Sequence, residues 1–211
     1  MIESIKTYIL DILSIFIPGA ILVAVLGQVP WLHEWFLTIG IHEYEGWINV
    51  GKFLVLIYIL GHFLFSLGSF LDECVYDKFK DRIWPNNELQ ELIVAYKIHV
   101  TGIESGNVLN AFKWCCSWLL INQPPLYENM ERHMAESKFF RSLVIVGIIG
   151  LVIFSIQSTY WLVALSVFVT IFSMIRYMTQ RKKSVDMAYQ SVITASHTEF
   201  EKFINHLDPK K

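Results

Sequence analysis

The sequence predicts an all-α integral membrane protein with four transmembrane helices and a helical cytosolic domain. Its 211 residues are 54% hydrophobic and only 17% charged, and the mean hydropathy is +0.45. A soluble chain of this length carries more charge and fewer apolar residues. The formal net charge of -2 gives no overall attraction to nucleic acids or to membrane surfaces. Any electrostatic signal must therefore lie in how the charges are distributed.

Four apolar runs are long enough to cross a bilayer, which requires roughly 20 residues of helix. They are Tyr8–Gly27, Gly51–Leu71, Phe139–Ile156 and Tyr160–Ile175. Only residues 157–159 separate the last two runs, which predicts a tight hairpin. The first run follows a single basic residue, Lys6, and lacks a small-x-small cleavage site, so we expect it to be retained as a helix.

The distribution of lysine and arginine predicts the orientation, because cytoplasmic loops carry the positive excess. Residues 28–50 contain none, whereas residues 72–138 contain seven and the stretch from Arg176 contains seven more. The prediction is an inner-membrane protein with both termini in the cytoplasm. The 28–50 loop is acidic and aromatic, as expected of an interfacial anchor at the outer surface.

The predicted organisation has four parts. Residues 1–71 form the first transmembrane pair with its outer loop 28–50, residues 72–138 a cytosolic helical insert, residues 139–175 the transmembrane hairpin, and residues 176–211 a cytosolic C-terminal helix. Within the insert we expect helices over Glu88–Val100 and Val108–Ile121. The second is apolar, but 14 residues with Lys113 near the middle are too few for a span, and Pro124 ends it.

The last two spans are expected to continue into the cytosol as helices. After Ile175, apolar and small residues recur every three or four positions, at Val185, Tyr189, Val192, Ser196, Phe200, Phe203 and Leu207. This spacing forms one helical stripe that must pack on something. Its two candidate partners are the insert of the same chain and the same stripe in a neighbouring copy.

Four residues in the first two spans are candidates for a pore or a gate: Asp11, His62, Gly61 and Gly68. Ionisable residues inside a membrane are costly and frequently functional. The plainer interpretation pairs Asp11 with a nearby lysine and gives His62 a hydroxyl or carbonyl partner. Gly61 and Gly68 then serve close helix packing.

A positive collar is predicted where the last two spans meet the cytosol. Its members are Lys113, Arg132, His133, Lys138, Arg141, Arg176, Arg181, Lys182 and Lys183. Such residues ordinarily reach lipid phosphates. With the neighbouring tryptophan and tyrosine side chains they also suit an anionic ligand such as a nucleotide or oligonucleotide.

No enzyme signature occurs in the sequence: there is no nucleotide-binding glycine motif, HExxH, GxSxG or CxxC. Three cysteines, Cys74, Cys115 and Cys116, predict reduced thiols and lack histidines at zinc-site spacing. We therefore expect no catalytic activity, no cofactor and no metal.

Four segments carry a resemblance to known proteins: Phe16–Gly19, Leu60–Asp72, Ser137–Leu143 and Arg176–Lys183. With the size and topology of the chain, they resemble small inner-membrane proteins of bacterial anti-phage defence operons, of the Kiwa and Hailong types. The resemblance implies a homo-oligomer, often a tetramer, that conducts ions when triggered or recruits a cytosolic partner.

Four short helices cannot enclose a water-filled pathway alone, so conduction requires several copies around an axis. The leading hypothesis is a homo-oligomeric membrane effector, an ion channel gated through its cytosolic domain by a partner protein or an anionic ligand. The alternative is a non-conducting sensor or scaffold that recruits a soluble partner to its cytosolic face.

Overall fold

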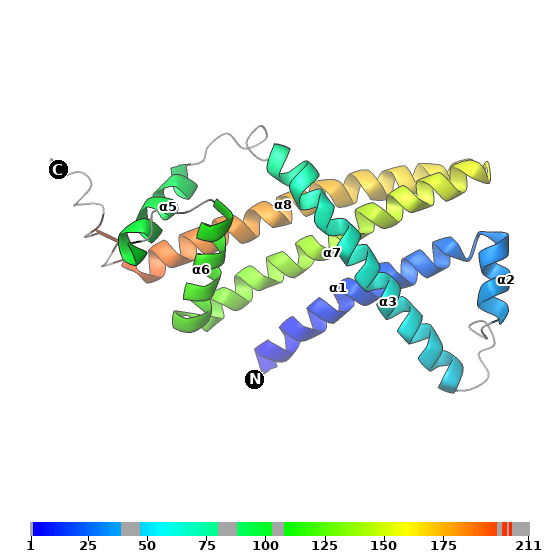
Figure 1. Ribbon diagram of the computed structural model, residues 1–211, viewed down its shortest axis with the longest axis horizontal. Coiled ribbons are helices and arrows are strands. Elements are labelled where there is room, and N and C mark those ends of the chain that lie inside the picture. Colours follow the sequence, from blue (N-terminus) through cyan, green and yellow to red (C-terminus); the bar gives the residue numbers. More distant parts are fainter. Residues whose placement is uncertain are drawn as a thin grey trace. The chain divides into compact units, whose positions relative to one another are not determined.

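A computed structural model describes residues 2–38, 47–79, 88–102, 108–197, 200, 201 and 203, with the backbone alone at 2–11, 37 and 108–110. Over these residues the chain is helical, without strands. The elements in Figure 1 are α1 (Ile2–Leu26), α2 (Pro30–Thr38), α3 (Trp47–Leu71), the π-helical turn η1 (Asp72–Tyr76), α5 (Glu88–Thr101), α6 (Val108–Asn122), α7 (Pro124–Ile156) and α8 (Tyr160–Ala195). The all-α prediction is therefore confirmed.

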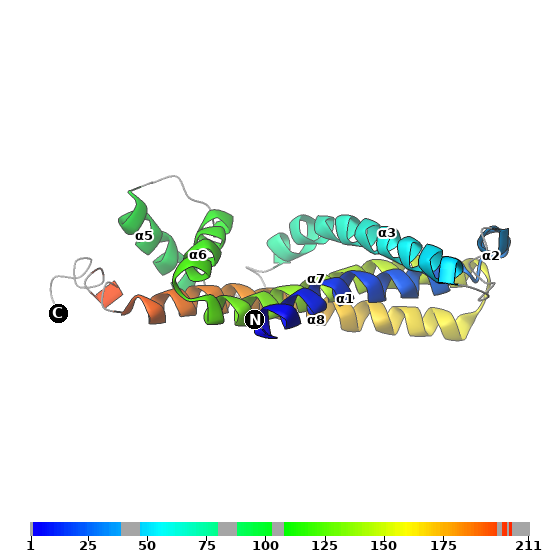
Figure 2. The same cartoon turned by 90° about the horizontal axis from the view of Figure 1, so that it is seen from below.

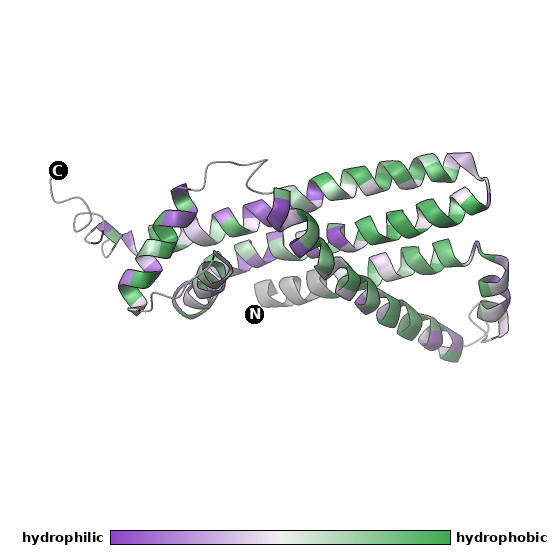
Figure 3. Ribbon diagram, turned by 45° about the horizontal axis from the view of Figure 1, so that its top comes forward, coloured by the Kyte–Doolittle hydropathy of each residue, from purple (hydrophilic) through white to green (hydrophobic). Residues whose placement is uncertain are grey.

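Three described helices are long and apolar enough to cross a membrane: Trp47–Phe79, which joins α3 to η1, and the two long helices α7 and α8. The segments Ile12–Leu26 of α1 and Pro30–Phe36 of α2 satisfy the same criteria as a pair, and they are bent by 117° at the break between them. Figure 3 shows hydrophobic residues concentrated along α3 and along the parts of α7 and α8 next to their connecting turn. These helices are those of a membrane protein.

The chain divides into two compact units. The first contains Met1–Asp77 and Ala135–Thr179, and the second contains Lys78–Met134 and Gln180–Lys211. Helices α7 and α8 contribute to both units, because the boundaries fall inside them. Residues 39–46, in the predicted outer loop, lie outside the described residues, whereas α2 lies within that loop.

In the first unit, α1 and α3 cross at glycines (Figures 1 and 2). A Cβ atom added to Gly19 would overlap the carbonyl oxygen of Ile57, and one added to Gly61 would overlap that of Ile15. The two backbones therefore approach each other as closely as glycine permits. Small residues at such crossings allow extensive van der Waals contact between membrane helices.

Helices α7 and α8 form the hairpin that the sequence predicts. The turn between them contains Ser158 with a φ of 55°, a left-handed conformation uncommon outside glycine. Along the hairpin, Gly150 on α7 faces Ser166 on α8, where an added Cβ would lie 3.0 Å from the serine Oγ. About one turn earlier in α7, Gly147 packs in the same way against Thr170 on α8.

The second unit is built around large apolar side chains. Tyr96 on α5 is buried, with its ring centroid 5.0 Å from that of Phe200 and 5.5 Å from that of Phe203. Leu119 on α6 and Val192 on α8 belong to the same core. The helical stripe that begins at Val185 thus packs on the insert of its own chain. Leu207, its last predicted member, lies outside the described residues.

Candidate functional site

The candidate site lies in the first unit, where α3 passes into the π-helical turn η1. The N–H of Asp77 donates a hydrogen bond to the carbonyl of Asp72, five residues earlier, as a π turn requires. Such turns frequently occur at functional positions in helices. Here the turn begins at Asp72, whose carboxylate lies between two other helices.

Asp72 joins α3 to both helices of the hairpin. One carboxylate oxygen of Asp72 accepts a hydrogen bond and ion pair from Arg141 on α7. The other accepts a hydrogen bond of 2.5 Å from the hydroxyl of Tyr177 on α8. The rings of Tyr177 and Tyr76 also meet edge to face, with centroids 6.4 Å apart. We call Asp72, Arg141 and Tyr177 the Asp72 triad.

The surroundings of Arg141 fix its position. The residue is 7% exposed, and its guanidinium carbon lies 4.9 Å from the centroid of the Phe65 ring, within cation–π distance. Gly68 makes room for the arginine side chain, since a Cβ there would lie 3.1 Å from both Cγ and Nε of Arg141. Among the described residues, Nε of Arg141 is buried without a hydrogen-bond partner.

The triad is strongly coupled energetically. Removing one member of a buried ion pair leaves the other charge uncompensated, which costs on the order of 3–5 kcal/mol. The Asp72 side chain is 26% exposed and that of Arg141 8%, so the carboxylate is the more accessible side of the pair. Because Asp72 is shared by Arg141 and Tyr177, any movement that separates it from one helix also disturbs its contact with the other.

The structure places three of the four predicted pore or gating residues in different surroundings. Gly61 is at the α1–α3 crossing, and Gly68 accommodates Arg141. His62 lies on the exposed side of α3, with its ring 4.4 Å from that of Tyr58 in an edge-on arrangement. The side chain of Asp11 lies outside the described residues, although its backbone belongs to α1.

The predicted positive collar is divided between the two units. Lys138, Arg141 and Arg176 belong to the first. Arg176 lies with its guanidinium carbon 5.5 Å from the centroid of the Phe140 ring. Arg141 was expected to face lipid phosphates or an anionic ligand. Instead its guanidinium is buried and paired with Asp72, which gives it a counter-ion within the chain.

The other six collar residues belong to the second unit: Lys113, Arg132, His133, Arg181, Lys182 and Lys183. Nδ1 of His133 lies 3.0 Å from the amide oxygen of Gln180, and Arg181 packs over the ring of Phe112 at 5.3 Å. Nζ of Lys182 lies 3.8 Å from a carboxylate oxygen of Asp186. Lys113, Arg132 and Lys183 are exposed. The exposed three are the most accessible to an anionic partner.

The cysteine thiols of α6 are weakly reactive. Burial raises the pKa of the Cys116 thiol to about 11, although nearby Arg181 acts in the opposite direction. Burial also raises the pKa of the neighbouring Cys115 thiol. Cys74, in η1, is exposed. Over the described residues, no three histidine, cysteine or acidic side chains gather in a metal-binding arrangement.

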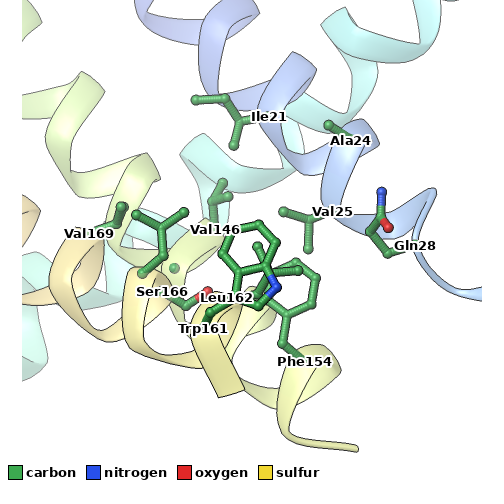
Figure 4. A pocket seen from close by; sticks show the side chains of 13 residues that line it. Ile21, Ala24, Val25, Gln28, Val146, Phe154, Trp161, Leu162, Ser166 and Val169 are labelled. Carbon is green, nitrogen blue, oxygen red and sulfur yellow. The ribbon is translucent and has the colours of Figure 1, made fainter. Parts of the chain in front are cut away.

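A cavity of about 340 Å³ lies between α1 and the α7–α8 hairpin (Figure 4). Apolar side chains such as Ile21, Val146 and Phe154 line most of it, with Gln28 and Ser166 as polar members. Figure 4 shows these side chains entering from the two sides. An apolar lining does not replace the hydration shell of an ion, so the cavity is not a candidate ion pathway.

Comparison with protein-family models, with curated proteins and with solved structures finds no match to this chain. Support for the candidate site therefore comes from the geometry of this chain alone.

Sequence reasoning missed Asp72 as a functional candidate, and it included Tyr177 only as an aromatic neighbour of the predicted positive collar. One signal was available for Asp72, since a carboxylate directly follows the apolar run of α3 and an arginine lies just inside the third predicted span. Two opposite charges near the ends of neighbouring membrane helices commonly pair with each other. Nothing in the local sequence distinguishes Tyr177 from the other aromatic residues of α8.

Proposed function

We propose that this protein is a homo-oligomeric, non-enzymatic effector of bacterial anti-phage defence, and that it forms an ion channel in the inner membrane. In this proposal the first unit supplies four spans per copy, from α1, α3, α7 and α8, with α2 in the outer loop. The second unit is cytosolic and receives a trigger, either a partner protein or an anionic nucleotide or oligonucleotide. The resemblance of four sequence segments to defence-operon membrane proteins supports the biological setting.

The position of the Asp72 triad along the chain is the observation that carries the proposal. The chain crosses between its units after Asp77, after Met134 and after Thr179. Each triad residue lies within two turns of helix of one of these crossings. A shift in the second unit that pulls on η1, α7 or α8 therefore acts on the triad through continuous helix.

We propose that the triad acts as a gate with two arrangements, one with its contacts made and one with them broken. With Asp72 bound to Arg141 and Tyr177, α3 is held against the hairpin. With these contacts broken, α3 is released and the charges require water or new partners. A ligand shifts such an equilibrium only by the difference between its affinities for the two states. We expect the trigger to bind the released state more tightly.

Membrane potential in cells tests the channel proposal. Asp72→Asn removes the counter-ion of Arg141 and is expected to depolarise cells without a trigger, as followed with a potential-sensitive dye. Tyr177→Phe removes one hydrogen bond to the carboxylate and should depolarise less. Tyr160→Phe, at an exposed tyrosine on the same helix, is the matched control and should behave as the unmodified protein.

Membrane insertion of every variant is checked by fractionation, so that an unfolded variant is recognised. The channel proposal is wrong if well-inserted variants and the unmodified protein during phage infection all leave the potential unchanged. Conduction by purified protein in liposomes would then also be absent.

A second candidate function, a non-conducting scaffold, is favoured by an apolar edge on α6. Leu120 is 53% exposed and Ile121 79% exposed, both in the second unit. Exposed apolar side chains of this size are common features of protein-binding surfaces. Under this alternative, Ile121→Ser abolishes co-purification of a stoichiometric soluble partner while the membrane potential never changes. The channel proposal expects the potential to change whether or not such a partner is recovered.

A further inference from the structure

The exposed side of α3 carries a line of polar residues along a helix built to cross a membrane. Tyr58, His62, Ser66 and Ser69 follow one another at intervals of four, four and three residues, and all four are exposed. That spacing keeps them on one face of an α-helix. We call these four residues the α3 polar stripe.

The opposite face of α3 is packed against other helices of the same copy. Ile57, Gly61, Leu64 and Gly68 are buried there. Gly61 contacts the backbone of α1, and Gly68 contacts Arg141 of α7. Rotation of α3 to hide the polar stripe would break both contacts. The stripe therefore stays on the outside of a single copy.

Most of the hydrogen-bonding capacity of the stripe is unused within one copy. The Ser69 hydroxyl donates to the carbonyl of Ser66 at 2.6 Å. The Tyr58 ring lies against the rings of Phe16 and His62. Neither the Tyr58 hydroxyl nor the His62 ring has a hydrogen-bond partner among the residues that the structure describes. Polar groups left unsatisfied in hydrocarbon cost several kcal/mol each.

Helix α8 provides an internal comparison. Its exposed side chains over the predicted span are apolar, among them Leu165, Phe168 and Ile171. Its serines, Ser166 and Ser173, are buried. This is the pattern of a helix that faces lipid, with polar groups turned inward. Helix α3 differs in that its exposed side carries the polar stripe beside apolar side chains, so lipid is a poor neighbour for the stripe itself.

We propose that the α3 polar stripe is covered by the same stripe of other copies of this chain, around an axis along the membrane normal. The proposal rests on the homo-oligomer proposed above and names the helix face that surrounds its axis. Copies related by such an axis place identical residues at identical depth. Tyrosine and neutral histidine each donate and accept hydrogen bonds, so the stripe is complementary to itself.

Apolar side chains beside the stripe complete the contact surface. Ile59, Phe63 and Phe70 are each more than half exposed and lie on the same side of α3. They supply the van der Waals area that helix association in membranes requires, while the polar groups supply interhelical hydrogen bonds.

Cysteine cross-linking in native membranes tests this inference. In a Cys74→Ser background, Ser66→Cys places a thiol on the stripe, and Ile171→Cys places one on the apolar face of α8 as the matched control. Oxidation with copper phenanthroline is expected to link most Ser66→Cys chains into disulfide dimers and to leave Ile171→Cys chains monomeric. Oligomer size is measured separately by native gel electrophoresis in mild detergent.

The outcomes separate this inference from the proposed function. An oligomer in which Ser66→Cys does not link, or in which Ile171→Cys links equally well, overturns the stripe interface and leaves the oligomer intact. A monomer without cross-links overturns both. Cross-linked oligomers that never conduct ions support the interface and contradict the channel.

A second set of variants tests the hydrogen bonds themselves. Tyr58→Phe combined with His62→Leu removes the unused donors and acceptors, and we expect oligomer dissociation to increase about tenfold, as loss of one to two interhelical hydrogen bonds predicts. Ser69→Ala is the control, because that hydroxyl is satisfied within its own helix. Equal dissociation for the two sets would contradict the proposal.

Discussion

The two compact units of this chain are packed by different means. In the first, helices meet through glycines and through a shared carboxylate: Gly61 lies against the α1 backbone, and Asp72 binds Arg141 and Tyr177. In the second, helices meet through large apolar side chains centred on Tyr96 and Leu119.

The difference follows from the solvent. Burial of apolar groups stabilises a unit that is surrounded by water, and large aromatic side chains bury the most area. In a bilayer, lipid is as apolar as a leucine side chain, so helices gain little by hiding apolar residues from it. Close backbone approach and polar pairing then dominate. The packing of the first unit is typical of membrane helices, and we propose that the second unit lies in water.

Breaking the buried pair is expected to have the largest effect on the first unit. Asp72→Leu leaves Arg141 buried without a counter-ion, and the free energy of unfolding should fall by about 3–5 kcal/mol. Denaturant titration in mixed micelles measures this change. Adding Arg141→Met should restore most of the loss, because neither charge then remains. A single variant that loses less than about 1 kcal/mol would contradict the assignment of the pair as buried and compensated.

Truncation of a buried side chain tests how the second unit is stabilised. Leu119 is fully buried, and Leu119→Ala should lower the free energy of unfolding by about 2–5 kcal/mol through lost burial and a cavity. Its neighbour Leu120 is exposed, so Leu120→Ala should change stability by less than about 0.5 kcal/mol. The measurement is the same titration, followed by tryptophan fluorescence. Similar losses for both variants would show that apolar burial does not hold this unit together.

The glycine crossing predicts a smaller effect. Gly61→Ala places a methyl group against the carbonyl of Ile15, and we expect a loss of about 1–3 kcal/mol from overpacking. In the same helix, Gly51 has nothing within 4 Å of an added Cβ, so Gly51→Ala should stabilise slightly, by about 0.5–1 kcal/mol. Thermal unfolding in detergent separates the two. If both substitutions stabilise, α1 and α3 do not approach as closely as described.

Thiol labelling compares the two units in the unmodified protein, without a substitution that changes its stability. With its pKa raised to about 11, only about a thousandth of Cys116 is thiolate at pH 8. Maleimide should therefore modify the exposed Cys74 first. Labelling of Cys116 should accelerate about tenfold per pH unit up to pH 10. Mass spectrometry of the peptides measures both, with unfolded protein as the control. Equal rates for Cys74 and Cys116 in the folded protein at pH 8 would show that the α6 core is open.

Local signals made much of the helical framework predictable. The predicted helix Glu88–Val100 is observed as Glu88–Thr101, and the predicted Val108–Ile121 is observed as Val108–Asn122. Gly102, with a φ of 66°, follows the first of these, as a glycine in the left-handed region commonly does at a helix end. Pro124 begins α7 after the second. These signals at helix ends act over a few residues, so they can be recognised in the sequence without the tertiary structure.

The candidate site was less accessible to sequence reasoning. Arg141 was interpreted as part of a basic collar because local sequence shows its charge but not its partner. That partner, Asp72, lies 69 residues away along the chain, and Tyr177 lies 105 residues from Asp72. Contacts at such separations depend on how helices rotate and cross.

The sequence alone determined that this protein is helical and apolar enough for a membrane, because helix periodicity and span length are properties of continuous segments. Only the tertiary structure decided which residues meet. Asp72, at the first position of a π turn after α3, contacts both α7 and α8. The α3 polar stripe is exposed because the opposite face of that helix is occupied by α1 and Arg141. Both outcomes depend on the packing of distant segments, which no local pattern encodes.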